Sequence, residues 1–444
     1  MLSAEENELL TRVGPGTLMG NLLRRYWAPA CLSLELPAPD CPPVRLRIYG
    51  ESLVAFRETS GKVGLVAENC PHRGASVYFG RNEDCGLRCV YHGWKFDVDG
   101  NCVDMPNEPA ESNFKSKVKI TAYPTHESGG IVWTYMGPKE TMPPFRDFGT
   151  ESLPEDQQYA TKEHIDCNWV QSLDGDLDSA HISHLHQYFA IDDIPDDGSD
   201  HPGYPSGPMS SKIWRYDRAP RLEVQEEWYG YRYAALRRTP NGHVQARISA
   251  YIMPFSALIA SAPFSTRQLA IVPSDDENTE RFSFTTQPRP NPRNLGGAPF
   301  SRVPNYPYRA LPAGSGIVPR EYTLANDYKQ SREAQRTVSF TGIEDFRSHD
   351  LMVTESMGRI YDRTQEHLGT TDVAVIRMHD VLLAAAKALA EGREPPGLGG
   401  GDFRSIRAAD KILEAGEDWR VLGTDDDPVV QEAMLSLQPG GGGQ

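Results

Sequence analysis

The sequence has no concentrated positive charge and no feature of a membrane or secreted protein. Lys and Arg number 45 against 61 Asp and Glu, a formal net charge of −16, and no segment is strongly basic. Such a field repels a phosphate backbone, so we expect no nucleic-acid partner. No uninterrupted apolar stretch approaches the roughly 20 residues that span a bilayer. The acidic start, MLSAEENELL, lacks the basic and apolar regions of a secretory signal, so we expect a cytoplasmic protein without a membrane anchor.

The patterns of cysteine and glycine argue against two further classes of protein. The seven cysteines are an odd number in a long chain that we expect in the cytosol, so metal ligation or burial explains them better than a disulfide framework. No glycine-rich phosphate-binding loop lies between a strand and a helix, and no internal repeat is visible. No flavin or nicotinamide fingerprint is present, so the chain itself does not take hydride.

The first third of the chain is dominated by short β-strands. Between Val44 and Met136, segments such as SLVAFRE and GGIVWTYM are separated by Gly, Asn and Asp turn signals, which predicts a small all-β domain. The segment before it, Glu5–Tyr26, is predicted to be a helical arm that packs on a larger body. We expect the arm over residues 1–25, the all-β domain over 26–142, a catalytic domain over 143–392 and a tail over 393–444.

The second domain mixes helices with strands. Its pattern predicts a helix near Trp169–His181, a polar loop over Asp192–Ser211, and then three strands, the last two joined by a tight turn at Pro240–Gly242. Residues 288–319 contain eight prolines, so they form a long ordered loop or a cover. Apolar residues at helical spacing between Thr371 and Glu391 predict a docked helix. The expected fold class is α+β, with an antiparallel sheet covered by helices in this domain.

Two short loops of the all-β domain each offer one thiolate and one imidazole. Cys70 and His72 lie in the first loop, and Cys89 and His92 lie in the second. Two cysteines and two histidines suit zinc or an iron–sulfur cluster, and their spacing alone leaves both open. In a Rieske cluster the cysteines hold one iron and the histidines hold the other. Cys85 is close enough to compete as a ligand, but we assign it to structure because it breaks the symmetry of the paired loops.

A second group of potential ligands lies in the segment NWVQSLDGDLDSAHISHLH. Asp174, Asp178 and His181 fall at i, i+4 and i+7, which places them on one face of a helix. His186 converges with His181 only if the helix ends or distorts near His184, which is the better ligand by helical geometry alone. Two histidines and a carboxylate that face a cavity form the triad that binds non-haem Fe(II) and leaves positions open for O₂ and substrate.

Both groups resemble the metal sites of one enzyme family. Residues 70–96 are similar almost throughout to the Rieske fingerprint of the ring-hydroxylating oxygenases. The spacing from Asp174 to His186 resembles the mononuclear-iron motif of the Rieske non-haem iron oxygenases, and the segment from Ser348 to Gly369 resembles their C-terminal helix. The resemblance covers nearly the whole chain. It is closest to the large (alpha) subunits of the phthalate 4,5-dioxygenase branch, which assemble without a small companion chain.

The resemblance implies which residues bind the mononuclear iron. It selects His181 and His186 over His184 and matches Asp350 to the ligating aspartate of the family. Asp345 is the alternative in the same segment, and an ordinary helix N-cap would explain either aspartate.

The resemblance also implies an electron path, two cofactors and two kinds of partner. Asp178 becomes the bridge that takes an electron from a Rieske histidine, His92, of a neighbouring subunit, and Asp174 supports the ligands from behind, where the family commonly has glutamate. The implied partners are a separate flavin and iron–sulfur reductase and further copies of the chain in a homotrimer or stacked trimers. The implied cofactors are a Rieske [2Fe–2S] cluster on Cys70, His72, Cys89 and His92, and mononuclear Fe(II) on His181, His186 and Asp350.

We therefore expect the terminal oxygenase of a multicomponent system that uses O₂ to hydroxylate an aromatic, carboxylated substrate. A monooxygenase that hydroxylates or removes an O- or N-methyl group is the alternative within the same fold. A pure electron-transfer Rieske protein is a more distant one, and a zinc-binding or metal-free module is the third. Arg247 lies on the polar face of a predicted strand, so it is a candidate clamp for a substrate carboxylate if that face borders the iron cavity. A solvated or acid-paired arginine is the ordinary alternative.

Overall fold

The computed structural model describes residues 1–109, 111–154, 157–190, 202–203, 207–260, 264–265, 267–286, 315–399 and 401–436. Most of the predicted polar loop, most of the proline-rich segment and the terminal GGGGQ lie outside these residues. At the described ends of the two segments the prediction of irregular structure is wrong. A helix, α4 (Gly207–Tyr216), begins inside the predicted loop, and β19 (Gly316–Ile317) pairs with β12 (Ala160–Ile165). Backbone pairing with a distant strand is not visible in local sequence.

The N-terminal arm consists of two short helices instead of the single helix that we predicted. α1 (Ala4–Thr11) and α2 (Leu18–Leu23) are separated by the Gly-Pro-Gly sequence at residues 14–16, which neither continues a helix nor donates a full set of backbone bonds. Thr17 begins the second helix by accepting a hydrogen bond from the backbone of Gly20. Both helices pack against α7 (Val373–Ala390), which is the partner that the sequence did not reveal.

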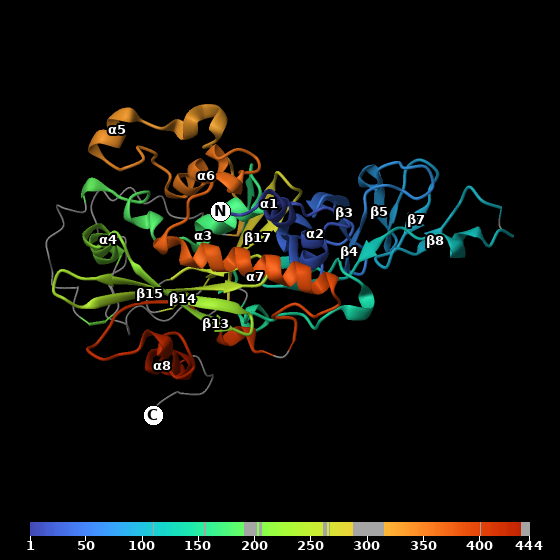
Figure 1. The fold of residues 1–444 in the computed structure, drawn as a ribbon. Coiled ribbons are helices and arrows are strands. Elements are labelled where there is room, and N and C mark those ends of the chain that lie inside the picture. The colour runs from blue at the N-terminus through green and yellow to red at the C-terminus, as the bar shows by residue number, and fades with distance from the viewer. Residues whose placement is uncertain are drawn as a thin grey trace, which may run out of the picture.

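The predicted all-β domain is confirmed as three small antiparallel sheets, and Figure 1 shows the part with β3, β4, β5, β7 and β8 as an extension to one side of the molecule. The sheet that carries β5, β7 and β8 stands at the far end of this extension. The first sheet has the order β1 (Ala28–Leu32), β11 (Ile131–Thr134), β10 (Thr125–Ser128); the second β2 (Val44–Ile48), β3 (Glu51–Arg57), β4 (Val63–Ala67), β9 (Ala122–Tyr123); and the third β5 (Arg81–Glu83), β6 (Gly86–Arg88), β7 (Lys95–Phe96), β8 (Cys102–Asp104).

A large mixed sheet, antiparallel except for the pair of β12 and β19, forms the centre of the second domain. Among the described residues it has nine strands. β14 (Gly230–Arg238) and β15 (Val244–Ile252) pair along their whole length around the turn predicted at residues 240–242, so the hairpin prediction is confirmed. The remaining strands are β13 (Arg221–Glu227), β16 (Ser256–Leu258), β17 (Arg267–Pro273), β18 (Thr279–Thr285) and β20 (Ala409–Ile412).

Helices cover this sheet, as the fold-class prediction requires. α3 (Trp169–Leu177) packs on β16 and β17 and also contacts α6 (Phe346–Ser356) and α7. The predicted docked helix is α7, whose buried face includes Val375, Met378 and Leu382. The short α5 (Arg332–Thr337) precedes α6 in the chain.

The inner strands of the all-β domain share one hydrophobic core with the large sheet, whereas the cysteine–histidine loops pack in a second cluster. Trp133 on β11 packs edge-on against Phe284 on β18, with ring centroids 5.3 Å apart and an interplanar angle of 90°. Both side chains are buried and belong to a single cluster that also includes residues of α2, α3 and α7. Aromatic edge-to-face packing adds to the free energy gained from burial of apolar area. The two parts of the chain are therefore joined by packing as well as by their connecting segment.

The segment that we expected to be a C-terminal tail packs on the catalytic sheet. β20 pairs with β15, with Asp410 opposite Arg247, and Trp419 is buried beside it. α8 (Pro428–Ser436) follows. The prediction of a separate tail therefore fails over residues 401–436, because a four-residue strand is too short to show an alternating pattern.

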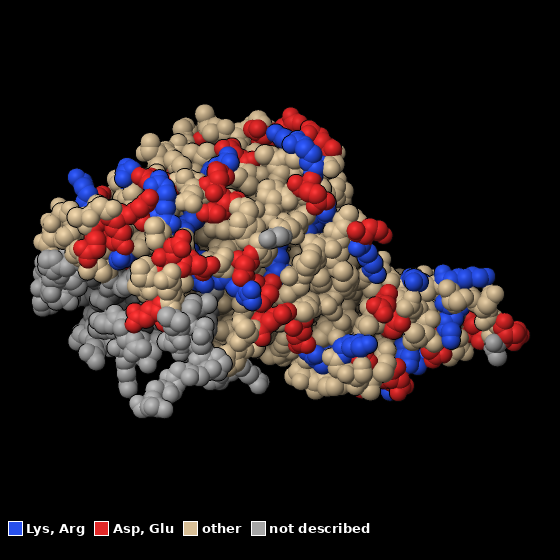
Figure 2. Space-filling view, turned by 90° about the horizontal axis from the view of Figure 1, so that it is seen from below, with Lys and Arg blue, Asp and Glu red and all other residues tan. Residues whose placement is uncertain are grey.

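Two further features concern helix length and surface charge. No helix in the described part of the chain is both long and apolar enough to cross a bilayer. On the face shown in Figure 2, acidic and basic side chains are intermingled and form no continuous field of one sign.

Asp174 joins α3 to α7 and does not lie behind the predicted metal ligands. Its Oδ1 is 2.8 Å from Nε2 of His379 on α7, and its Oδ2 accepts a hydrogen bond of 2.7 Å from Nη2 of Arg363. Burial alone would raise the pKa of Asp174, but His379 and Arg363 outweigh it and lower the pKa. The expectation that Asp174 supports the iron ligands is therefore wrong, because the side chain is turned toward a buried cation elsewhere.

This arrangement predicts that Asp174→Asn lowers stability without removing a metal. The fully buried Arg363 would lose its carboxylate partner, so we expect a loss of about 3 kcal/mol in the free energy of unfolding. The check is thermal or urea unfolding together with iron analysis of the folded fraction. Normal stability combined with loss of iron would contradict the structural role.

Candidate metal centres

The two cysteine–histidine loops form the same backbone turn. Gly74 donates its N–H to the carbonyl of Cys70 at 2.9 Å, and Gly93 donates to the carbonyl of Cys89 at 3.0 Å. The φ angles of the two glycines are 75° and 79°, a region that residues with side chains rarely adopt. The turns thus favour glycine at both positions. The loops are equivalent in backbone structure although their histidines follow the cysteines at different intervals.

Four potential ligands converge between these loops. The Cys70 and Cys89 side chains are buried, and the rings of His72 and His92 lie 4.4 Å apart between centroids. The Nδ1 atoms of both histidines are buried and have no hydrogen-bond partner in the described structure. Buried ring nitrogens normally have a partner, so these two atoms fit a group that lies between the loops. Two thiols and two free imidazole nitrogens are the donor set of a Rieske cluster.

Cys85 is placed away from this group. It is exposed at the turn between β5 and β6, and its backbone N–H donates to the hydroxyl of Thr59 at 2.9 Å. The small pocket between the paired loops is lined by Cys70, Cys89 and both histidines but not by Cys85. Its position agrees with a structural role.

The second group of ligands depends on where α3 ends. α3 stops at Leu177, and Asp178 has the extended conformation φ −78°, ψ 118°. Its carboxylate accepts hydrogen bonds from the backbone N–H of Ala180 at 2.6 Å and of His181 at 3.2 Å, which competes with helical bonding. The prediction that Asp174, Asp178 and His181 share one helical face is therefore wrong. The chain leaves the helix before His181, and a short 3₁₀ turn over His181–Ser183 then ends at His184.

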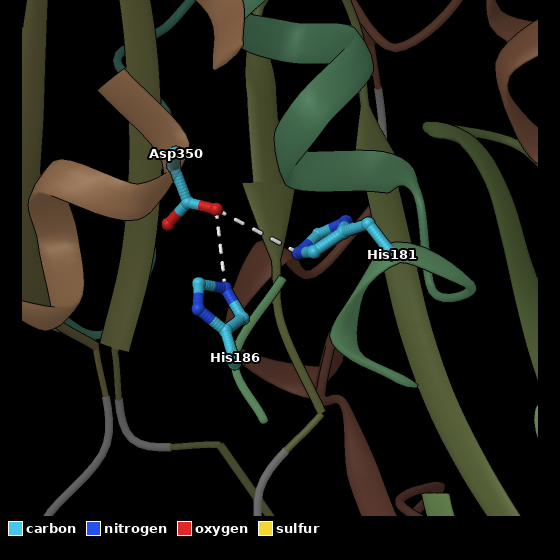
Figure 3. Close-up of side chains that lie close together, drawn as sticks. All are labelled: His181, His186 and Asp350. Atoms are coloured by element: carbon cyan, nitrogen blue, oxygen red, sulfur yellow. Dashed lines mark ion pairs between the residues drawn. The ribbon is translucent and has the colours of Figure 1, made fainter. Parts of the chain in front are cut away.

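This turn brings the predicted triad together. Figure 3 shows His181, His186 and Asp350 pointing toward one another, with Asp350 supplied by α6. Oδ1 of Asp350 is 3.1 Å from Nε2 of His186 and 3.7 Å from Nε2 of His181. One donor atom from each residue lies within 4.8 Å of the other two, so a single cation fits between them. Among the described residues, no other group of three or more His, Cys, Asp or Glu side chains meets this distance criterion.

The two rival ligands lie elsewhere. His184 is exposed, and its ring packs against the ring of Phe340 at 5.5 Å between centroids. Asp345 is the N-cap of α6, where its carboxylate accepts a hydrogen bond of 2.9 Å from the backbone of Ser348. Geometry therefore separates the two histidines and the two aspartates that the sequence pattern alone left open.

Each imidazole of the triad has a partner for its second ring nitrogen. Nδ1 of His181 lies 3.4 Å from Oδ2 of Asp178, and Nδ1 of His186 lies 3.2 Å from Nδ1 of His349. The ring that ligates through Nε2 is oriented by what its Nδ1 bonds to. Sequence reasoning found the first partner and missed the second, which is the residue directly before Asp350.

Charges around the triad are buried and balanced. Burial would raise the pKa of Asp350, but His186, His181 and Arg281 outweigh it and lower the pKa. Burial raises the pKa of the neighbouring Asp176 to about 6, although Nη2 of Arg281 lies 2.6 Å from its Oδ1. Arg281 thus compensates two carboxylates in a site of low dielectric.

The triad opens onto a cavity of about 530 Å³. Arg247 on β15 lines it, so the polar face of this strand does border the triad, and its Nη1 donates to the hydroxyl of Ser179 at 2.7 Å. Trp214, Ile259 and Leu269 contribute apolar surface to the same cavity. The volume and the mixture of apolar walls with a few charged groups are typical of a small-molecule site.

Comparisons with known proteins agree with this description. Residues 26–124 match the model of the Rieske [2Fe-2S] domain, and residues 134–294 with 316–439 match that of the "LigXa C-terminal domain like" family. The phthalate 4,5-dioxygenase oxygenase subunit of Pseudomonas putida is 41% identical over 85% of this chain and 84% of its own length. The 3-chlorobenzoate-3,4-dioxygenase oxygenase subunit of Comamonas testosteroni is 38% identical over 85% and 87%.

A solved structure of dicamba monooxygenase bound to dicamba superimposes on 84% of this chain and all of its own, with a TM-score of 0.53 and 19% identity, which shows a shared fold. The sequence relatives cover most of the chain and most of their own length, and the two domain models follow one another as the two parts of the fold do. The chain therefore belongs to the Rieske non-haem iron oxygenases, enzymes that carry a Rieske [2Fe–2S] cluster and a mononuclear iron.

Proposed function

We propose that this chain is the terminal oxygenase of a multicomponent system that hydroxylates an aromatic, carboxylated substrate. The observation that carries the proposal is the triad of His181, His186 and Asp350, which opens onto a cavity lined by Arg247. When bound, the cluster supplies single electrons and the ferrous ion supplies activation of O₂ beside the substrate. The chain's own residues place the metals, hold the substrate and exclude water.

The protein ligands leave part of the mononuclear site accessible. The two Nε2 atoms and Oδ1 of Asp350 approach from α6 and from the segment after α3, while the cavity lies beside them. A cation held by three protein atoms keeps open positions for other ligands. This supports the assignment of His181, His186 and Asp350 as iron ligands, and of Cys70, His72, Cys89 and His92 as ligands of the cluster.

The positions of the two centres in one chain favour assembly into a ring. The loops with the cluster ligands belong to the extension in Figure 1, whereas α3 and α6 lie in the main body. The cluster loop is exposed, with Val90 at 60% and Tyr91 at 53% relative exposure beside His92. A contact between the extension of one copy and the body of the next is heterologous, and such contacts form a ring when the rotation between neighbours closes. We propose a homotrimer in which His92 of one subunit faces Asp178 of its neighbour.

Electrons must enter from another protein. The chain has no flavin or nicotinamide fingerprint, so a separate flavin and iron–sulfur reductase is the proposed donor. Asp178 is suited to lie between the two centres because its carboxylate contacts both the backbone and Nδ1 of His181. The same contacts hold the imidazole with its Nε2 toward the metal.

Arg247 is the proposed clamp for the substrate carboxylate. Its side chain is 8% exposed, and the face of its guanidinium lies 5.5 Å from the ring of Trp214. A buried guanidinium that faces a cavity can bind a carboxylate through two parallel hydrogen bonds. The named substrates of the two sequence relatives, phthalate and 3-chlorobenzoate, are aromatic carboxylates. We therefore place an aromatic acid in the cavity with its carboxylate on Arg247 and its ring toward the iron.

The second candidate is a monooxygenase on the same scaffold. Its support is the similarity to the 5,5'-dehydrodivanillate O-demethylase oxygenase subunit of Sphingobium sp. (strain NBRC 103272 / SYK-6), which is 32% identical over 84% of this chain and 78% of its own length. The triad does not distinguish insertion of one oxygen atom from insertion of two, so the separation rests on the product. Mass analysis of product formed under ¹⁸O₂ distinguishes them, because a dioxygenase product carries label in both new hydroxyl groups.

The first prediction concerns metal content and turnover. Purified protein should contain about three irons per chain, of which two belong to the cluster. With a reductase, it should consume O₂ only when an aromatic acid is present. About two irons per chain and no substrate-dependent O₂ consumption would instead support a pure electron carrier.

The second prediction concerns Asp178→Asn. The amide keeps an acceptor for the backbone of Ala180 but removes the charge beside His181, so iron content should stay close to normal. We expect reduction of the mononuclear iron by the cluster to slow by roughly 10- to 100-fold. The measurement is stopped-flow reoxidation of the reduced cluster in the presence of substrate. Reoxidation at the wild-type rate would remove Asp178 from the proposed electron path.

The third prediction concerns Arg247→Ala. Loss of a charge-assisted pair should raise KM for an aromatic acid by about 10- to 100-fold, because such bonds contribute about 1.5–3 kcal/mol. KM for the methyl ester of the same acid should change much less, and Arg247→Lys should give an intermediate value. Equal increases for acid and ester would refute the clamp.

A further inference from the structure

We propose that His349 is a positioning residue for the mononuclear iron, because its Nδ1 accepts the Nδ1–H of His186 and so keeps Nε2 of His186 directed at the metal. The inference rests on the proposed function, since it requires His186 to be a ligand. His349 lies on α6 directly before Asp350, and its side chain is fully buried. One turn of α6 would then supply a ligand and the residue that orients another ligand.

The backbone carbonyl of Ile343 determines the direction of the hydrogen bonds that link Ile343, His349 and His186. Nε2 of His349 lies 2.9 Å from the backbone oxygen of Ile343. A carbonyl oxygen only accepts, so this nitrogen carries a proton and donates it. In neutral His349 the other nitrogen, Nδ1, then has a free lone pair.

That lone pair determines the tautomer of His186. The two Nδ1 atoms are 3.2 Å apart, so one must donate and the other must accept. Because Nδ1 of His349 accepts, the proton of His186 lies on Nδ1. When a cation lies between them, Nε2 of His186, which is 3.1 Å from Oδ1 of Asp350, is then the unprotonated nitrogen that faces it. If His349 were doubly protonated, its Nδ1–H would point at the Nδ1–H of His186, and no hydrogen bond could form between them.

A single loop holds both histidines. Thr341 and Ile343 contact Nε2 of His349, with Oγ1 of Thr341 at 3.0 Å. The same loop pairs with the backbone that flanks His186. Phe340 donates its N–H to the carbonyl of Gln187, and Phe189 donates its N–H to the carbonyl of Val338, both at 2.9 Å. The His186 backbone and the His349 ring are thus fixed to one another through this loop.

The partners of the two ligating imidazoles differ in charge. His181 has the carboxylate of Asp178 behind it, whereas His186 has a neutral imidazole. A carboxylate in place of His349 would be a further buried negative charge beside Asp350, which is costly without a cation. A neutral acceptor fixes the tautomer and adds no charge to the site.

Two isosteric substitutions separate orientation of the ligand from structural support. In His349→Asn the amide oxygen replaces the acceptor near the Nδ1 position and the bond to Ile343 is lost. In His349→Gln the amide reaches the Nε2 position, so the bond to Ile343 is kept and the acceptor for His186 is lost. We expect His349→Gln to weaken Fe(II) binding by roughly 10- to 100-fold and His349→Asn to leave it close to wild type.

The measurement is anaerobic competition of the full-length, cluster-containing protein with a chelator for added Fe(II). Thermal unfolding of the protein without mononuclear iron supplies the second readout. The His349→Asn variant should have a lower unfolding temperature than the His349→Gln variant, because His349→Asn leaves the carbonyl of Ile343 buried without a donor. If His349 had a purely structural role, Fe(II) affinity would follow stability. The His349→Asn variant would then bind Fe(II) more weakly than the His349→Gln variant. His379→Gln, at another buried histidine, is the matched control and should lower stability without weakening iron binding.

The outcomes are distinct. Equal iron affinity of the Gln variant and the wild type, or equal losses in Gln and Asn, would overturn the role of His349 and leave the proposed function intact. A wild-type protein that binds no Fe(II) beyond its cluster would refute the proposed function itself.

Discussion

The mononuclear site depends on the end of α3 at Leu177. The carboxylate of Asp178 accepts the N–H groups of Ala180 and His181, and these bonds replace the ones that would have continued the helix. The hydroxyl of Tyr233 donates to the carbonyl of Leu177 at 2.5 Å, and Nη2 of Arg237 donates to the carbonyl of Ser179, also at 2.5 Å. Without this turn, His181 and His186 would project from different sides of a helix.

The same turn connects the substrate cavity with the metal site. Ser179 accepts a hydrogen bond from Arg247 through its side chain and one from Arg237 through its backbone. Burial raises the pKa of Asp410 on β20 to about 6, although Arg247 and a hydrogen bond from Gln245 act against it. Buried arginines and acids from β14, β15 and β20 thus hold the turn from behind. This explains why the C-terminal segment packs on the sheet, since its carboxylate offsets cationic charge under the cavity.

The fold places the cluster loops and the triad in different parts of one molecule. A shared core around Trp133 and Phe284 joins the inner strands of the all-β domain to the body, and the cysteine–histidine loops pack in a second cluster. The cluster loop is exposed, and the homotrimer proposed above would bring it against the body of another copy through a heterologous contact.

The sequence by itself determined the all-β and α+β parts, the helix of α7, the hairpin of β14 and β15, and the cysteine–histidine loops. These features follow from local alternation, helical spacing and turn residues, which act over a few positions. Local pattern also indicated His181 with His184 or His186 as ligands, and the family resemblance selected His186 and supplied Asp350. The same local pattern placed Asp174, Asp178 and His181 on one helix face. Only the tertiary structure decided where α3 ends, that Asp174 bonds to α7, that β20 joins β15, and that His349 lies behind His186. Each of these depends on groups more than a hundred residues apart in the chain, or on competition between a side chain and the backbone, and neither leaves a periodic signal.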